Sequence, residues 1–104
     1  MLKLSVFYQY TEGTKFNMEY FLTKHMPLVE KAWGGALKKK EIDSGLCGSE
    51  RDTPPIYIAS IHLYFDSIES MLSAVNQQHQ EMEKDRPHFT DILPITQLSR
   101  VESC

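Results

Sequence analysis

The stretch "IYIASIHLYF", residues 56–65, decides the fold of this chain. Its length and its aromatic and β-branched content are typical of a β-strand. The odd positions carry only apolar side chains, and the even positions mix apolar side chains with serine and histidine. Both faces of such a strand must be covered, so the pattern predicts a central strand of a sheet. The odd set comprises Tyr57, Ala59, Ile61, Leu63 and Phe65, and the even set comprises Ile56, Ile58, Ser60, His62 and Tyr64.

Three further strands are predicted around this one. Residues 2–10 alternate between an apolar face and a mixed face, which indicates a half-buried strand. Residues 36–45 are a charged and weaker strand, and residues 94–102 form the last one, with Pro94 tolerated at its beginning.

Two helices are predicted between the strands. The first runs from Met18 to Trp33, with Asn17 as its cap and a Gly-Gly pair as its stop. The second begins at "FDSIES", where Asp66 and Glu69 have the spacing of a capping box. Its inner stripe recurs at helical spacing and comprises Ile68, Met71, Leu72, Val75, His79 and Met82.

The element order β-α-β-β-α-β predicts an α+β, ferredoxin-like fold in a single domain over residues 1–104. Right-handed crossovers place both helices on one face of a four-stranded antiparallel sheet. The other face would be bare and apolar, and a second copy of the sheet is its simplest cover. The sequence therefore predicts a homodimer packed through Phe7, Ile56, Ile58 and Tyr64.

Composition excludes several classes of function. The net charge of -3 argues against a nucleic-acid partner, and no stretch reaches the ~20 apolar residues of a membrane span. The two cysteines, Cys47 and Cys104, form no disulfide framework, so we expect a reducing cytoplasm. The spacing of the histidines fits no metal site, and no glycine-rich loop follows a strand. We therefore expect no metal, no nucleotide cofactor and no nucleophilic triad.

The segment "KHMPLVEKAWGG", residues 24–35, places His25 on the apolar stripe of the first helix, two residues before Pro27. Proline breaks or bends a helix, so packing beside His25 should be loosened. His25 is then either a packed histidine that satisfies a backbone group or a carboxylate, or a polar group that faces a ligand cavity. The predicted inward set is Met18, Phe21, Leu22, His25, Val29, Ala32 and Trp33.

The other histidines are weaker candidates. His62 should lie on the sheet face away from His25, and His79 falls on the inner stripe of the second helix. His88 lies in the loop "DRPHFTD", either on the surface or in a lid over the cavity. Aromatic side chains could supply flat walls for a ligand, although most would be core in any fold of this size. These are Tyr8, Tyr20, Phe21, Trp33, Tyr57, Phe65 and Phe89.

Three segments carry a family resemblance: "FNMEYFLTKHMPLVEKAWG", "PPIYIASIHLYFDSIESM" and "EKDRPHFTDILPITQ". Together they resemble the EthD family of small dimeric α/β-barrel proteins, and "HMPLV" and the run from Asp85 to Asp91 are the most specific parts. The resemblance implies a dimeric α/β barrel and an oxidoreductase-related role beside an ether-degrading monooxygenase system. The wider superfamily includes quinone-forming monooxygenases, polyketide cyclases and haem-degrading enzymes. His88 departs from the asparagine-like residue expected there.

Two classes of function stay open at this point. The first is a cofactor-independent enzyme, or an accessory to an oxygenase, that acts on a small apolar or aromatic metabolite. His25 would then be the acid or base, aided by the hydroxyl of Tyr8. The second is a non-catalytic binding or structural homodimer. Beside these two classes, a haem protein with His25 as axial ligand is also considered. The ligand-binding set in the first class is Phe21, Trp33, His79, His88 and Phe89.

Overall fold

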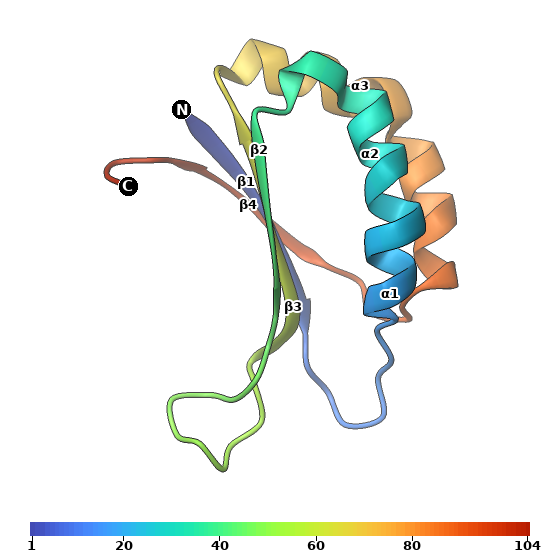
Figure 1. Cartoon of the computed structure of the whole chain (residues 1–104), viewed down its shortest axis with the longest axis vertical. Helices are drawn as coiled ribbons and strands as arrows, with labels where there is room; N and C mark the ends of the chain where they lie inside the picture. Colours follow the sequence, from blue (N-terminus) through green and yellow to red (C-terminus); the bar gives the residue numbers. More distant parts are fainter.

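A computed structural model gives the backbone of residues 1–104 and the side chains of residues 1–75 and 80–104. It contains one four-stranded antiparallel sheet of strand order β2-β3-β1-β4, with the helices on one face only (Figure 1). The predicted ferredoxin-like fold is therefore confirmed. In chain order the elements are β1 (Leu2–Gln9), α1 (Met18–Tyr20), η1 (Phe21–His25), α2 (Met26–Trp33), η2 (Gly34–Ala36), β2 (Lys39–Ser44), β3 (Tyr57–Phe65), α3 (Ile68–Asp85), η3 (Arg86–His88) and β4 (Ile95–Arg100).

Strand β3 lies between β2 and β1, which confirms its predicted central place. From Ala59 to Phe65 its odd positions are buried against the helices, with Ala59 and Phe65 fully inaccessible. At its beginning the predicted faces are wrong, because the pairing with β1 shifts register between Tyr8 and Gln9. A bulge adds one residue and exchanges the faces of the residues beyond it. The ring of Tyr57 therefore packs 4.6 Å from that of Phe7, while Ile58 packs against the core.

The sheet face without helices is more polar than predicted. His62 lies there, as expected, and its Nδ1 is hydrogen-bonded to Ser5 Oγ at 2.8 Å. Tyr64 donates its hydroxyl to Glu41 Oε1 at 2.5 Å. Of the expected apolar face, Phe7 remains, packed with Tyr57 and paired with the half-exposed Ile95 of β4. Ile58 belongs to the core instead, and Ile56 lies before β3 and is 66% exposed.

The first predicted helix is divided by η1, a π turn of five residues that ends directly before Met26-Pro27. Its beginning is as predicted, because Asn17 Oδ1 accepts from the backbone N–H of Tyr20 at 3.0 Å. In the wide turn the N–H of Met26 donates to the carbonyl of Phe21, five residues earlier. The extra residue changes which side chains face the sheet. Leu22, predicted inward, is 47% exposed, whereas Met26 is 1% exposed.

Helix α3 covers the sheet beside α2 (Figure 1). Its N-cap is Ser67, whose Oγ accepts from the Ser70 N–H at 3.1 Å, so the predicted cap at Asp66 is one residue early. Ile68 and Leu72, both predicted on the inner stripe, are 48% and 46% exposed. The inner side is formed by Met71, Ala74, Val75 and Met82, and the predicted inner residue His79 lies outside the described side chains. None of the helices in the part of the chain described here has the length and apolar character to cross a membrane.

Candidate functional site

A cavity of about 560 Å³ lies between the helices and the sheet. Pockets of this size are within the range that holds small organic ligands. Its walls come from strands β1, β3 and β4, from η1, α2 and α3, and from the segment that follows α3. The lining is mostly apolar and comprises Leu4, Val6, Tyr8, Phe21, His25, Met26, Val29, Trp33, Ile61, Leu63, Val75, Met82, Glu83, Arg86, Phe89, Leu93, Pro94 and Thr96.

His25 is the last residue of η1 and is 7% exposed. Its ring packs beside two aromatic rings, with centroid distances of 5.2 Å to Phe21 and 4.6 Å to Phe89, whose own centroids are 5.1 Å apart. These contacts fix the plane of the imidazole. The structure combines parts of the two roles that the sequence left open for His25, since the ring packs against Phe21 and Phe89 and also lines the cavity.

A carboxylate orients this imidazole. His25 Nδ1 lies 2.9 Å from Asp85 Oδ2, at the end of α3. The second carboxylate oxygen accepts from the hydroxyl of Tyr20 at 2.8 Å. An ionised carboxylate only accepts hydrogen bonds, so Nδ1 carries the proton and Nε2 keeps its lone pair. A histidine held in this way is a positioned base.

The protonation states follow from burial and from these hydrogen bonds. Burial lowers the pKa of His25 below its ordinary 6.5, and the hydrogen bond and charge of Asp85 oppose this only in part. Partial burial of Asp85 acts to raise the pKa of its carboxyl, but the hydrogen bonds from His25 and Tyr20 outweigh it and the net direction is down. At neutral pH the pair is therefore a neutral imidazole beside a carboxylate.

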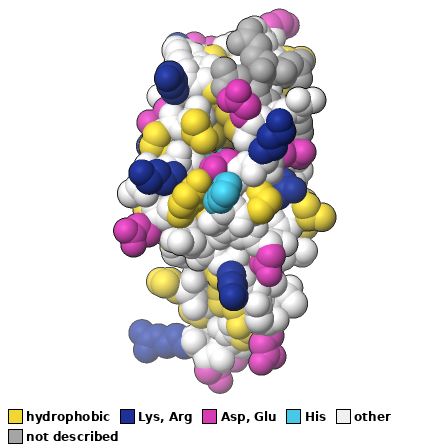
Figure 2. All heavy atoms as spheres, turned by 90° about the vertical axis from the view of Figure 1, so that its right-hand side faces the viewer, with side chains coloured by type: hydrophobic (Ala, Val, Ile, Leu, Met, Phe, Trp, Pro, Cys, Tyr) yellow, Lys and Arg dark blue, Asp and Glu magenta, His cyan; other side chains and the backbone are white. Residues whose placement is uncertain are grey.

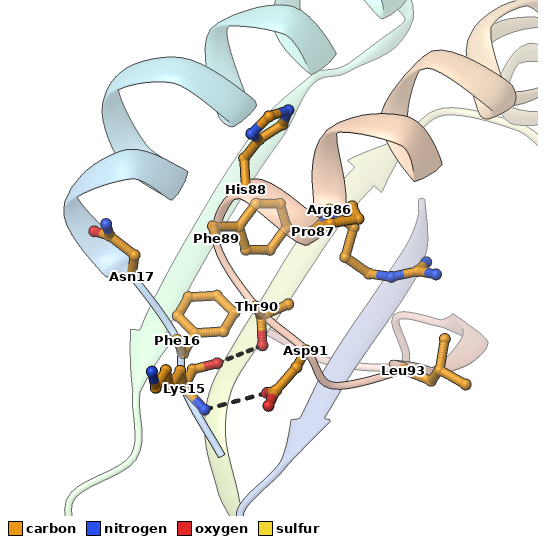
Figure 3. A pocket seen from close by; sticks show the side chains of 10 residues that line it. All are labelled: Lys15, Phe16, Asn17, Arg86, Pro87, His88, Phe89, Thr90, Asp91 and Leu93. Carbon is orange, nitrogen blue, oxygen red and sulfur yellow. Dashed lines mark hydrogen bonds between the residues drawn. The ribbon is translucent and has the colours of Figure 1, made fainter. Parts of the chain in front are cut away.

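Two hydrogen-bond donors share the cavity with His25. Tyr8 is 5% exposed, and burial raises the pKa of its hydroxyl to about 12, although the charge of Arg86 opposes the rise. Tyr8 therefore stays protonated and can donate. Arg86 also lines the cavity, and Figure 3 shows its side chain extending from the loop toward β1.

The loop that carries Arg86 is tied to the entrance of α1 (Figure 3). Thr90 Oγ1 donates to the carbonyl of Lys15 at 2.6 Å, and Asp91 Oδ1 accepts from the Lys15 N–H at 3.2 Å. The N–H of Asn17 donates to the carbonyl of Phe89 at 2.7 Å. Phe89 is 3% exposed and forms part of the cavity wall.

A second hollow of about 570 Å³ lies on the other side of this loop. His88 lines it and points away from Phe89 in Figure 3, with its ring stacked 5.9 Å from that of Tyr20. Arg86, Phe89 and Leu93 line both spaces.

The structure thus brings together most of the predicted site residues. His25, Tyr8, Phe21, Trp33 and Phe89 all line the one cavity. His88 lies outside it, and the side chain of His79 is not described.

Sequence reasoning assigned no role to Asp85 or Arg86, and it counted Tyr20 only as an aromatic wall. The only signal for the first two was their place in the "DRPHFTD" segment. Among the described residues, no three histidine, cysteine or acidic side chains gather in a way that could hold a metal ion.

Comparison with known proteins agrees with the fold and names a family. The model of the EthD domain matches residues 14–92. No curated protein matches the chain significantly. An EthD-like protein from Ralstonia eutropha JMP134 has a solved structure that is 34% identical, with a TM-score of 0.94 over 98% of this chain and 92% of that one.

Two more distant structures share the fold. An ethyl tert-butyl ether D (EthD) family protein from Bacillus halodurans C-125 is 19% identical, with a TM-score of 0.73 over 97% of this chain and 98% of that one. A dimeric protein of ferredoxin-like fold from Bacteroides fragilis NCTC 9343 is 10% identical, with a TM-score of 0.52 over 96% of this chain and 95% of that one. From the domain match and the 34% identical structure, the chain belongs to the EthD family.

Proposed function

We propose that this protein is an enzyme that moves a proton on a small, largely apolar oxo compound bound in the cavity. The observation that carries the proposal is the Asp85–His25 hydrogen bond at 2.9 Å, which presents a neutral imidazole to an apolar cavity. A base with a pKa near or below neutrality is suited to proton transfer at neutral pH.

The proposed step needs no co-reactant. Nε2 of His25 takes a proton from the carbon next to a carbonyl group, and the electron pair of the C–H bond forms a carbon–carbon double bond. The carbonyl oxygen gains the negative charge as an enolate. The imidazolium is stabilised by Asp85 and then returns the proton to carbon or to oxygen, which completes an isomerisation or an exchange.

Tyr8 and Arg86 would stabilise the enolate. The hydroxyl of Tyr8 stays protonated because burial raises its pKa to about 12. The guanidinium of Arg86 lines the same cavity, and its charge is partly offset by Glu83, whose Oε1 lies 3.8 Å from Arg86 Nη1. Donors held in place in a poorly hydrated site stabilise developing charge strongly. An enolate is also the electron-rich species from which a cyclisation or an oxygenation starts.

The proposal predicts exchange of the α-protons of phenylacetone with D2O, measured by proton NMR. Exchange should exceed that with free imidazole at equal concentration. The rate should be constant at neutral pH and fall only below pH 6.5, because burial lowers the pKa of His25 and the active neutral form persists to lower pH. Binding of phenylacetone without exchange would contradict catalysis and leave the alternative, a non-catalytic binding protein.

We also propose that the chain forms a homodimer through the sheet face without helices. This face carries Phe7 and Tyr57, and Ser5 is 3% exposed there. The helix face carries acidic and basic side chains interspersed with apolar ones, as expected for a face in water (Figure 2). A neighbour of the same fold is described as dimeric, which supports the proposal.

Sedimentation equilibrium should give twice the chain mass of 12.0 kDa at micromolar concentration. Phe7→Glu should shift the protein to monomer, because it places an unpaired carboxylate in the buried centre of the interface. Leu28→Glu is the matched control, since Leu28 is 43% exposed on α2, and it should leave the mass unchanged. A monomeric wild type would contradict the dimer.

A further inference from the structure

We infer that the cavity selects ketones that carry a hydroxyl group on the carbon next to the carbonyl, and that Glu83 is the residue that selects the hydroxyl. The carbonyl oxygen accepts from Arg86, and the hydroxyl donates to the carboxylate of Glu83. This inference rests on the proposed function, because it assumes that an oxo compound occupies the cavity. It adds the class of that compound and a specificity-determining residue.

The chemistry of the polar groups in the lining is the first observation. Apart from the indole of Trp33, whose N–H is inaccessible, the polar side chains of the lining are Tyr8, His25, Glu83, Arg86 and Thr96. Glu83 is the one carboxylate among the described residues that line the cavity. An ionised carboxylate only accepts hydrogen bonds, and the oxygen of a simple ketone only accepts them too. A ligand that binds beside Glu83 must therefore carry a donor as well as the carbonyl.

The order of three of these groups is the second observation. Tyr8 is 5% exposed, the side chain of Arg86 is 23% exposed and that of Glu83 is 53% exposed. The charge of Arg86 opposes the rise in the pKa of the Tyr8 hydroxyl, and Arg86 Nη1 lies 3.8 Å from Glu83 Oε1. Arg86 therefore connects the buried hydroxyl of Tyr8 with a carboxylate nearer to solvent. A ligand that matches this order has its carbonyl oxygen inward and its hydroxyl outward.

The spacing of Arg86 and Glu83 is the third observation. Their separation of 3.8 Å is longer than a hydrogen bond, although the two charges still attract each other. A guanidinium has five N–H donors and a carboxylate has several acceptor sites, so each can bind a ligand atom while the ion pair persists. The two oxygens of an α-hydroxy ketone can lie side by side at about hydrogen-bond distance. One oxygen can then accept from Arg86 while the other donates to Glu83.

Isothermal titration calorimetry with three ketones that differ in one group tests the inference. The first is 1-hydroxy-3-phenylpropan-2-one, the second is 1-phenylbutan-2-one, in which a methyl group replaces the hydroxyl, and the third is phenylpyruvate, in which a carboxylate replaces the hydroxymethyl group. The wild type should bind the hydroxy ketone about fivefold more tightly than the methyl analogue, since solvent weakens a hydrogen bond to the half-exposed Glu83. Phenylpyruvate should bind less tightly than the hydroxy ketone, because its carboxylate would lie beside that of Glu83.

Glu83→Ala is expected to bind the hydroxy ketone and the methyl analogue equally, and to bind phenylpyruvate more tightly than the wild type does. Alanine favours the helix, so α3 should be kept. Glu81→Ala is the matched control, because Glu81 is exposed on the same helix and does not line the cavity. It should keep the fivefold preference of the wild type.

Three results would each overturn the inference: equal affinities of the wild type for the hydroxy ketone and its methyl analogue, a fivefold preference that survives in Glu83→Ala, or tighter binding of phenylpyruvate than of the hydroxy ketone. Failure of all three ketones to bind would overturn it too. The exchange of phenylacetone protons tests the proposed function separately, because phenylacetone has no hydroxyl group. Exchange without a preference for the hydroxyl would leave the proposed function standing, and a preference without exchange would leave only the binding site.

Discussion

Replacement of His25 by asparagine is expected to lower the rate of proton exchange by about 10²–10⁴-fold, the usual contribution of a general base. Asparagine keeps a polar side chain beside Phe21 and Phe89 but cannot take up a proton. The affinity for phenylacetone should change little, because the apolar walls of the cavity remain. The measurement is the exchange rate at saturating ligand, with calorimetry for the affinity.

His88→Asn is the matched control for this substitution. It removes an imidazole from the neighbouring loop, but His88 lines the outer hollow and not the cavity. Its exchange rate should equal that of the wild type. If His25→Asn also exchanges protons at the wild-type rate while its melting curve is unchanged, His25 is not the base.

Asp85→Asn is expected to lower the exchange rate by about 10²–10⁴-fold although Asp85 is not the base itself. The carboxylate holds Nδ1 protonated, and an amide can present its NH₂ group to Nδ1 and favour the wrong tautomer of His25. Substitutions of this kind in histidine–carboxylate pairs have effects of that order.

The pH dependence of the exchange rate shows whether Asp85 positions His25 or only supports the fold. The hydrogen bond and charge of Asp85 act to raise the pKa of His25, so their loss should lower that pKa further. The acid limb of the residual activity of Asp85→Asn should therefore move to lower pH. Asp91→Asn is the control, because Asp91 only accepts from the backbone of Lys15 and an amide oxygen does the same. A reduced rate with an unmoved acid limb would show that Asp85 acts only through the fold.

Much of the cavity was predictable because apolar periodicity determines which side chains share the space between a helix and a sheet. His25, Phe21 and Trp33 follow from the stripe of the first helix, and Tyr8 follows from the alternation of the first strand. The errors of orientation in the first helix and at the beginning of β3 have one physical cause. The π turn η1 and the bulge at Tyr8/Gln9 each add one residue to a regular repeat, and neither leaves a local sign strong enough to place it.

The Asp85–His25 pair could not be predicted from periodicity at all. The two residues are 60 positions apart, and the contact depends on where the end of α3 meets η1. The loop after α3 is a second case in which periodicity does not determine which side chain faces the cavity. His88 and Phe89 are neighbours in sequence, yet only Phe89 lines the cavity, because the loop is fixed by its hydrogen bonds to Lys15 and Asn17.

The wide turn η1 also constrains how the gene of this protein can change in length. Loss of one codon within Phe21–His25 would restore a regular α-helix and rotate everything before it by about 100° relative to α2. Tyr20 would then leave Asp85, and Asn17 would leave the carbonyl of Phe89, while the core side of α2 stayed in place. Relatives that keep the same chemistry should therefore tolerate substitutions in this stretch far better than a single-residue gap.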